Sequence, residues 1–306
     1  MAVFSVIISV FNKEPYIQDT IESVLNQSFD KFELIVVNDG STDSSLEIIE
    51  SFDDNRLHII TTTNLGASSS RNTGIKAAQN QYIALLDGDD LWDKDFLKEI
   101  HHCIQKYPEQ AVFSTALAQK YENKIVPSRY NFEQKTTCQI HNYFKSSLGQ
   151  SILSSSSLVF DKGILKTTGY FNTSIISGQD TDMWIRIGIH YDIVFINKIL
   201  AYYRYVPNSL SNTTFDLQKK PNFEAYKTFE ADNGPLKRFL DINRYSLALM
   251  SKINNQKEAY VYFKSNLDMA NLPLTKKVLL LSPKWVLKGL LKIKSLKKER
   301  LYYRPL

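Results

Sequence analysis

The sequence has little cysteine, glycine and proline, and it has no long apolar run. Its two cysteines, Cys103 and Cys138, are too few for the disulfide framework of a secreted domain. Only 11 glycines and 9 prolines occur among 306 residues, which excludes collagen-like and low-complexity chains. The most apolar stretch, residues 278–291, contains Ser282, Pro283 and two lysines, so we expect no membrane span. With no leader-like segment before residue 4, these features favour a cytoplasmic protein.

What is present fits a folded protein with a basic tail. The chain is 43% apolar and 12% aromatic, and its length suggests one main domain with an appendage. The net charge is +5, but residues 276–306 contain ten Lys or Arg and one Glu, which leaves a mildly acidic body. This distribution indicates that the tail meets an anionic surface, which need not be nucleic acid.

The first hundred residues alternate between strand and helix patterns. Short apolar runs predict four strands, and each run is followed by a segment with helical spacing. The predicted strands are residues 4–10, 32–37, 57–60 and 82–86, and the predicted helices are 15–27, 46–52, 68–78 and 96–107. Such alternation predicts an α/β fold with a mostly parallel sheet covered by helices on both faces.

The rest of the chain is mixed and then helical. We expect strands at residues 111–118, 152–160 and 192–199 and a helix at 182–189, followed by helices over 223–270. The helical part fits a scaffold or a homo-oligomer contact, and periodicity does not separate the two.

In parallel sheets, ligands bind beyond the carboxyl ends of the strands. The loop after the first predicted strand lacks the glycine-rich turn of dinucleotide-binding proteins. The fourth strand leads into Asp87, Gly88, Asp89 and Asp90. Carboxylates at this spacing suit Mg²⁺ or Mn²⁺ bridged to a nucleotide's phosphates, although aspartates in a turn can also cap the next helix.

A second pair of carboxylates, Asp180 and Asp182, precedes an apolar helical run. These residues fit either helix caps or a general base that accepts a proton from an incoming hydroxyl. The five histidines have no metal-ligand spacing, and the serine runs lack the turn of a serine hydrolase nucleophile.

Taken in order, five segments over about residues 4–212 resemble the family 2 glycosyltransferases with the GT-A fold. The segments are Ser5-Val-Ile-Ile-Ser-Val-Phe-Asn12, Val37-Asn-Asp-Gly-Ser-Thr-Asp43, Asn64-Leu-Gly-Ala-Ser-Ser-Ser-Arg-Asn72, Leu86-Asp-Gly-Asp-Asp-Leu-Trp92 and Gly178-Gln-Asp-Thr-Asp-Met-Trp184. The fourth resembles the Asp-x-Asp motif and the fifth the motif of the catalytic base. The family uses nucleotide sugars and inverts the anomeric configuration.

The resemblance implies roles for individual residues. Asp39 would bind the imide edge of uracil, Arg71 would lie near the diphosphate or support the aspartates, and Asp180 would be the general base. The other implied donor-binding residues are Val10, Phe11, Asn12, Glu14, Asn64, Asp87, Gly88 and Asp89. Asp89 and Asp87 would hold Mn²⁺ or Mg²⁺, and Asp182 and Trp184 would contact the acceptor.

The chain departs from the family pattern at two positions. Gln179 stands where relatives commonly have Glu before the base, which should reduce any upward shift of the pKa of Asp180. Val206 stands where many relatives have a metal-binding His, so metal dependence is less firmly implied.

The tail contains a helical pattern from Lys284 to Arg300. Val286, Leu287, Leu290 and Ile293 share one face, and lysines recur every four residues. This pattern favours a helix lying on an anionic membrane, and a helix packed onto the protein is the alternative. The expected organisation is a GT-A domain at residues 1–212, a helical extension at 213–275 and the basic tail at 276–306.

The expected function is transfer of a sugar from a UDP-sugar to a hydroxyl of a saccharide or lipid-linked acceptor. It would serve cell-surface polysaccharide or glycolipid synthesis on the inner face of the cell membrane, with no nucleic acid involved. The alternatives are a non-catalytic nucleotide-sugar-binding subunit and a nucleotidyltransferase. The sequence does not identify the sugar, the acceptor or the linkage.

Overall fold

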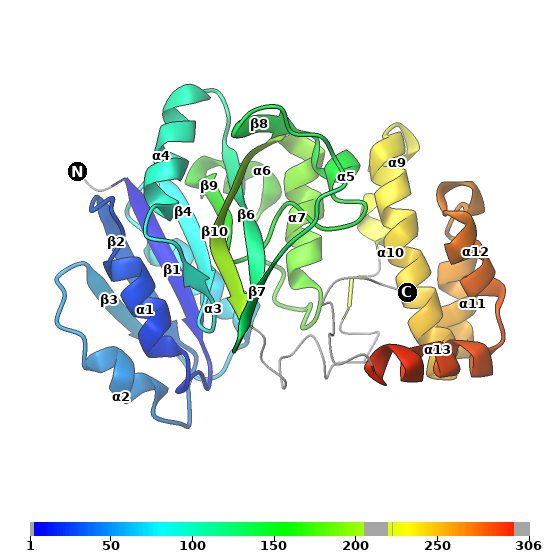
Figure 1. Cartoon of the computed structure of the whole chain (residues 1–306), viewed down its shortest axis with the longest axis horizontal. Coiled ribbons are helices and arrows are strands. Elements are labelled where there is room, and N and C mark those ends of the chain that lie inside the picture. Colours follow the sequence, from blue (N-terminus) through cyan, green and yellow to red (C-terminus); the bar gives the residue numbers. More distant parts are fainter. Residues whose placement is uncertain (1–2, 205–219, 222, 297–306) are drawn as a thin grey trace. The chain divides into compact units, whose positions relative to one another are not determined.

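A computed structural model describes residues 3–204, 220–221 and 223–296 (Figure 1). It divides into two compact units, Met1–Tyr143 with Ser151–Pro221 and Phe144–Gln150 with Asn222–Leu306. The predicted boundary at residue 212 and the tail beyond residue 296 lie outside the described residues. None of the described helices is long and apolar enough to cross a membrane.

The first unit is built on a mixed sheet of ten strands. The path runs β3-β2-β1-β4-β9-β6-β10-β5, and β7 and β8 pair with β6 and β10. The strands are β1 (Phe4–Val10), β2 (Phe32–Asn38), β3 (Leu57–Thr61), β4 (Tyr82–Asp87), β5 (Leu91–Trp92), β6 (Val112–Tyr121), β7 (Lys124–Pro127), β8 (Cys138–His141), β9 (Leu158–Asp161) and β10 (Ile193–Arg204). The first four pair in parallel, and β9 joins them antiparallel to β4, so the predicted α/β sheet is confirmed.

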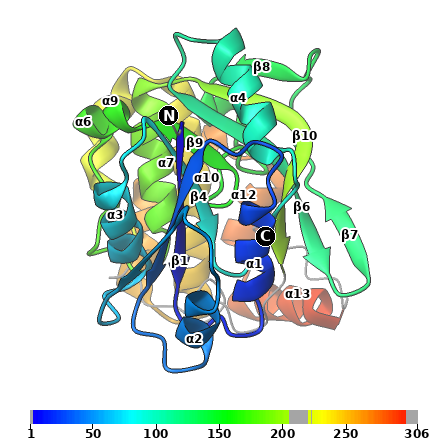
Figure 2. The same ribbon diagram turned by 90° about the vertical axis from the view of Figure 1, so that its left-hand side faces the viewer.

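Helices cover both faces of this sheet (Figure 2). The helices of this unit are α1 (Ile17–Leu25), α2 (Ser45–Glu50), α3 (Ala67–Ala77), α4 (Phe96–Lys106), η1 (Lys162–Ile164), α6 (Leu165–Thr168) and α7 (Gln179–His190). Phe4, Val6 and Ile8 point to the face that packs with α1, α2 and α4 in one apolar core. On the other face α3 packs against β1, and Gly74 allows this close approach because a Cβ at that position would clash with Ile7.

One predicted strand is much shorter in the structure. The strand expected over residues 152–160 is confined to Leu158–Asp161, because serines 154–157 form a turn whose Ser157 N–H donates to the Ser154 carbonyl at 3.0 Å. The hydroxyl of Ser156 also donates to the buried carboxylate of Asp90. Hydrogen bonds of this kind compete with strand pairing.

The two cysteines form a disulfide that the sequence analysis did not predict. Cys103 of α4 is bonded to Cys138 of β8, and both are buried. Because disulfides form in oxidising environments, the cysteine count no longer supports a reducing compartment.

The second unit is helical, as predicted. Its elements are η3 (Glu224–Tyr226), α9 (Lys227–Ala231), α10 (Gly234–Ile253), α11 (Lys257–Ser265), η4 (Met269–Asn271), α12 (Leu274–Leu281) and α13 (Lys284–Leu296). The short helix α5 (Tyr143–Ser146) has its first residue in the first unit and the other three in the second unit. Asn233 caps the start of helix α10, because its side chain accepts from the Leu236 N–H at 3.0 Å, and the helix packs against α9, α11, α12 and α13.

Candidate active site

Loops that follow three parallel strands meet at one edge of the sheet. Val10 of β1 pairs with Asn38 of β2, and Ser9 pairs with Asp87 of β4, so these strands end at the same level. The segments after them, which contain most of the predicted donor-binding residues, therefore share the carboxyl edge of the sheet. This is the edge at which parallel α/β proteins bind ligands.

Arg71 joins two carboxylates that lie in separate sequence motifs. Its Nη1 donates to Asp180 Oδ1 at 2.8 Å, and its Nη2 donates to Asp87 Oδ1 at 2.7 Å. The arginine is buried, and its guanidinium lies 5.3 Å from the centre of the Phe171 ring. This bridge brings the candidate base and the first carboxylate of the Asp-x-Asp segment into one site.

The candidate base lies inside a helix rather than at its cap. Helix α7 begins at Gln179, and its N-cap is Gly178, a position with φ 87° that favours glycine. Asp180 and Asp182 are therefore first-turn residues, so the alternative that they cap the helix is wrong, and the role of Asp180 as general base stays a prediction. With its cap position taken by glycine, the helix leaves the Asp180 carboxylate available to Arg71.

The environment of Asp180 suits a general base. Burial raises the pKa of its carboxyl, the Arg71 guanidinium opposes that rise, and the Asp87 charge adds to it. Solvent still reaches the group, because 38% of the side chain is exposed. The neutral Gln179 leaves burial and Asp87 as the causes of the raised pKa. A carboxylate with a raised pKa accepts a proton more readily than an ordinary aspartate.

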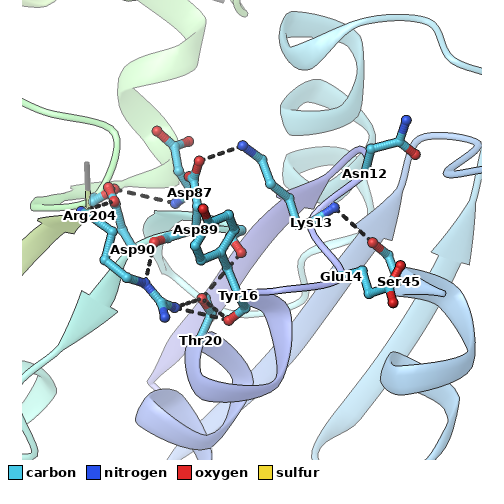
Figure 3. A network of polar contacts seen from close by, with 12 residues as sticks. Asn12, Lys13, Glu14, Tyr16, Thr20, Ser45, Asp87, Asp89, Asp90 and Arg204 are labelled. Carbon is cyan, nitrogen blue, oxygen red and sulfur yellow. Dashed lines mark hydrogen bonds and ion pairs between the residues drawn. The ribbon is translucent and has the colours of Figure 1, made fainter. Parts of the chain in front are cut away.

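The Asp-x-Asp segment is fixed by ionic and hydrogen bonds (Figure 3). Asp89 forms an ion pair with the Lys13 ammonium. Asp90 is completely buried, and it accepts hydrogen bonds from the Ser156 hydroxyl and from the Arg204 backbone N–H at 2.9 Å. Burial and the charges of Asp89 and Asp87 raise the pKa of Asp90 well above its ordinary value. Asp90 thus anchors the turn, which leaves its neighbours to contact ligands.

Arg204, at the end of β10, connects this turn to helix α1. Its Nε donates to the Asp89 carbonyl at 2.6 Å, and its Nη1 pairs with Asp19 at 2.8 Å. Its Nη2 donates to the Tyr16 carbonyl and the Thr20 hydroxyl, both at 2.9 Å. The sequence analysis did not assign Arg204 or Lys13 a role. Their partners lie far away in the sequence, so no short motif indicates these contacts.

The predicted metal ligands lie beside side-chain cations. No group of three His, Cys, Asp or Glu side chains close enough to hold an ion occurs in the part of the chain that the structure describes. Asp87 contacts Arg71 and Asp89 contacts Lys13, so positive charge is accommodated at both carboxylates. Mg²⁺ and Mn²⁺ accept one or two carboxylates with water and phosphate oxygens, and these two residues fit such a site. Val206 lies outside the described residues.

Asp39 is an organising residue of the edge. It is buried after β2, and its oxygens accept from the Thr62 hydroxyl at 2.6 Å and from the backbone N–H groups of Leu65 and Gly66 at 2.8 and 2.7 Å. These hydrogen bonds lower the pKa of its carboxyl despite its burial. Asp39 therefore holds in place the loop that contains Asn64 and leads into α3.

Most of the remaining predicted donor-binding residues lie at the end of β1 or in the loop after it. The Asn12 side chain accepts from the Thr42 N–H at 2.8 Å, and Glu14 accepts from the Ser44 N–H at 3.3 Å, which ties this loop to the loop after β2. Val10 is buried, whereas Phe11 is exposed. Asn12 and Asn64 have positive φ values of 51° and 53°, and at Gly88 a Cβ would lie 3.0 Å from the Ser9 carbonyl.

The two predicted acceptor-binding residues, Asp182 and Trp184, are both buried. Asp182 is buried and pairs with Arg186 one turn along α7, with the Nη2 atom at 2.7 Å. Trp184 is buried, and its ring centre lies 6.1 Å from that of Phe171. Phe171 also lies against the Arg71 guanidinium, so Trp184 and Arg71 contact the same ring.

A separate cavity of about 450 Å³ lies next to α1. Its lining includes Asp19, Trp92 and Tyr202, and none of the predicted site residues is among its lining residues. Asp19 also pairs with Arg204, so the cavity and the Asp-x-Asp turn share one ion pair.

The sequence also matches a known family. Residues 5–169 match the family described as Glycosyl transferase family 2, and the chain belongs to that family. It is a glycosyltransferase with the GT-A fold.

Relatives and solved structures agree with this assignment. TuaG of Bacillus subtilis, named as a teichuronic acid biosynthesis glycosyltransferase, is 29% identical over 74% of this chain and 88% of its own length. Chondroitin synthase of Escherichia coli is 27% identical over 82% of this chain and only 35% of its own length. The structure of S. aureus TarS residues 1–349 in complex with UDP-GlcNAc superposes with a TM-score of 0.70, at 20% identity, over 88% of this chain and 82% of that one.

Proposed function

We propose that this enzyme is an inverting glycosyltransferase that moves a sugar from a UDP-sugar to a hydroxyl of a saccharide or lipid-linked acceptor. The observation that carries the proposal is the Arg71 bridge, which joins Asp180, a carboxylate of raised pKa, to Asp87 of the Asp-x-Asp segment. Relatives named for teichuronic acid and chondroitin synthesis support a role in cell-surface polysaccharide or glycolipid synthesis. The UDP-GlcNAc complex of TarS supports UDP as the donor nucleotide.

In this proposal the edge of the sheet binds the donor. The loops held by Asn12, Glu14 and Asp39 frame the uridine, and a remaining lone pair of Asp39 accepts from the uracil imide. Lys13 and Arg71 lie beside the Asp-x-Asp carboxylates, where their charges stabilise the diphosphate. Mn²⁺ or Mg²⁺ held by Asp89 and Asp87 would supply further neutralisation of the diphosphate.

Asp180 acts on the acceptor. Its carboxylate removes the proton of the acceptor hydroxyl as that oxygen attacks the anomeric carbon of the donor sugar. The bond between the anomeric carbon and the phosphate oxygen breaks, its electron pair leaves with UDP, and Asp180 keeps the proton. One displacement inverts the anomeric configuration and needs no covalent sugar intermediate.

Replacement of the base tests this mechanism. Asp180→Asn removes the proton acceptor at nearly constant size, so we expect transfer from UDP-sugars to fall at least about a thousandfold. UDP should still stabilise the variant against thermal unfolding, by about 2.7 kcal/mol at a hundred times its dissociation constant. Asp192→Asn, which removes an exposed carboxylate near the end of α7, is the control and should transfer normally.

Three results would contradict the proposal. An Asp180→Asn variant with normal turnover would assign the base elsewhere. A wild-type protein that UDP does not stabilise, with or without Mn²⁺, would show that these loops form no uridine site. A product that retains the donor's anomeric configuration would exclude the single displacement.

A further inference from the structure

The C-terminal helices of the second unit expose large apolar side chains. The exposed fractions are 76% for Leu274, 57% for Val278, 62% for Leu281 and 76% for Trp285. The first three lie at i, i+4 and i+7 and therefore share one face of α12, and Trp285 follows at the start of α13. We call these four residues the apolar stripe. Clustered exposed side chains of this size mark an interaction surface.

Within the two helices that form the stripe, all charged residues are basic. Leu274–Leu296 contains no Asp or Glu, and its lysines are Lys276, Lys277, Lys284, Lys288, Lys292 and Lys294. Lys288 and Lys292 are exposed, whereas the Lys276 ammonium lies 4.6 Å from the centre of the Tyr245 ring. A surface that combines apolar side chains with lysines alone is complementary to anionic lipid headgroups above an acyl layer.

The stripe differs from the apolar face expected from the sequence. That face of α13 was to include Leu287 and Leu290, but Leu287 is completely buried within the unit and only 37% of Leu290 is exposed. Helix α13 packs against α10, which explains the burial. Leu287 of the predicted face is therefore used in folding, and α12 with Trp285 supplies the more exposed apolar side chains.

We propose that the apolar stripe enters the boundary between headgroups and acyl chains of an anionic bilayer, with the neighbouring lysines at the headgroups. Tryptophan suits this position because its ring is apolar and its N–H is polar. A second copy of the chain fits less well, because a twofold contact would bring the same lysines of both copies together. If the proposed function holds, the enzyme meets lipid-linked acceptors at this surface. Only this consequence rests on the proposed function.

Vesicle binding by the full chain tests the inference. Vesicles of phosphatidylcholine with about a third phosphatidylglycerol should bind the wild type, and vesicles of phosphatidylcholine alone should bind it much less. Leu281→Gln with Trp285→Gln should weaken binding at least about tenfold, since two side chains lose their apolar contact. The matched control is Ile125→Gln with Val261→Gln, which removes two side chains that are 55% and 62% exposed elsewhere. This control should bind like the wild type.

Several outcomes would overturn the inference. Equal binding of the two double variants would show that the stripe does not contact the bilayer. Equal binding to neutral and anionic vesicles would show that the lysines do not contribute to the contact. A concentration-dependent dimer that Leu281→Gln with Trp285→Gln dissociates, without vesicle binding, would identify a second copy as the occupant. The vesicle assay contains no substrate, so its failure would not affect the evidence for UDP binding or for transfer to a water-soluble acceptor. A failure of sugar transfer would likewise not affect the evidence for vesicle binding.

Discussion

Arg71 in the first unit and Arg244 in the second each join two carboxylates, but the two clusters differ in completeness. Arg244 contacts Glu230 at 2.7 Å and Asp241 at 3.2 Å, and Asp241 is completely buried. The other groups that donate to Asp241 are the Lys237 ammonium, the Asp268 N–H and the Asn271 amide. Every side of this carboxylate faces a donor, as a structural role requires.

The cluster around Arg71 is left open. Arg71 contacts one oxygen of Asp87 and one of Asp180, and 28% and 38% of these two side chains are exposed. A buried arginine that holds partly exposed carboxylates can keep them in place while they meet a ligand. The same ion-pair chemistry therefore fills a closed cluster in one unit and leaves partly exposed carboxylates in the other, where the proposed function places the reaction.

Arg244→Met should give the largest change in stability. Loss of the guanidinium leaves buried acceptors without their partner, so we expect the free energy of unfolding to fall by about 3–5 kcal/mol. Denaturant unfolding measures this change, and Arg238→Met on the exposed side of α10 is the control. Transfer per folded molecule should not change. A loss of stability no larger than that of the control would remove the structural role.

Arg71→Gln should act mainly on the reaction. Without the cation, the site loses its stabilisation of the diphosphate and its hold on Asp180, and we expect kcat to fall about 10²–10³-fold. Arg56→Gln, which breaks the ion pair with Asp54 elsewhere in the unit, is the control. Initial rates with saturating donor measure the effect. If kcat falls only in proportion to the unfolded fraction, the open cluster is structural after all.

The sequence predicts what depends on local spacing. The alternation of strand and helix, and the segments that contain Asp39 and Asp87, follow from apolar periodicity and strand ends. The disulfide and the Arg204 contacts depend on distant segments and were missed. The packing that buries Leu287 was only the alternative to a membrane-facing helix. Residues 152–157 failed as a strand because serine side chains bonded locally and to Asp90.

The site is predicted in part for the same reason. The motif resemblance identified Arg71, Asp87 and Asp180, but no spacing indicates that one arginine bridges the other two. Asp182 was expected at the acceptor, yet its partner Arg186 lies one helical turn away, a pairing that helix geometry favours.

The pH dependence of transfer separates the roles of Arg71 and burial. In the proposed mechanism transfer needs the deprotonated Asp180, so kcat should fall as the pH drops through the pKa of its carboxyl. Burial raises that pKa above 3.8, so the acidic limb should lie at a higher pH than for an ordinary aspartate. Arg71 lowers the same pKa, and Arg71→Gln should therefore move the limb further up. A limb that stays in place in the variant would contradict the electrostatic coupling.

Lys13→Met should give the smallest effect, on metal affinity. The Lys13 ammonium contacts Asp89, so an ion at that carboxylate displaces it, and the variant should bind Mn²⁺ more tightly. The gain should be about fivefold or less, since partly exposed ion pairs contribute about 1 kcal/mol or less. Titration of free Mn²⁺ by electron paramagnetic resonance measures the affinity, with the exposed Lys31→Met as control. With UDP present the gain should shrink, because the displaced ammonium then pairs with the diphosphate. Weaker Mn²⁺ binding without UDP would show that Lys13 orients Asp89 rather than competing for it.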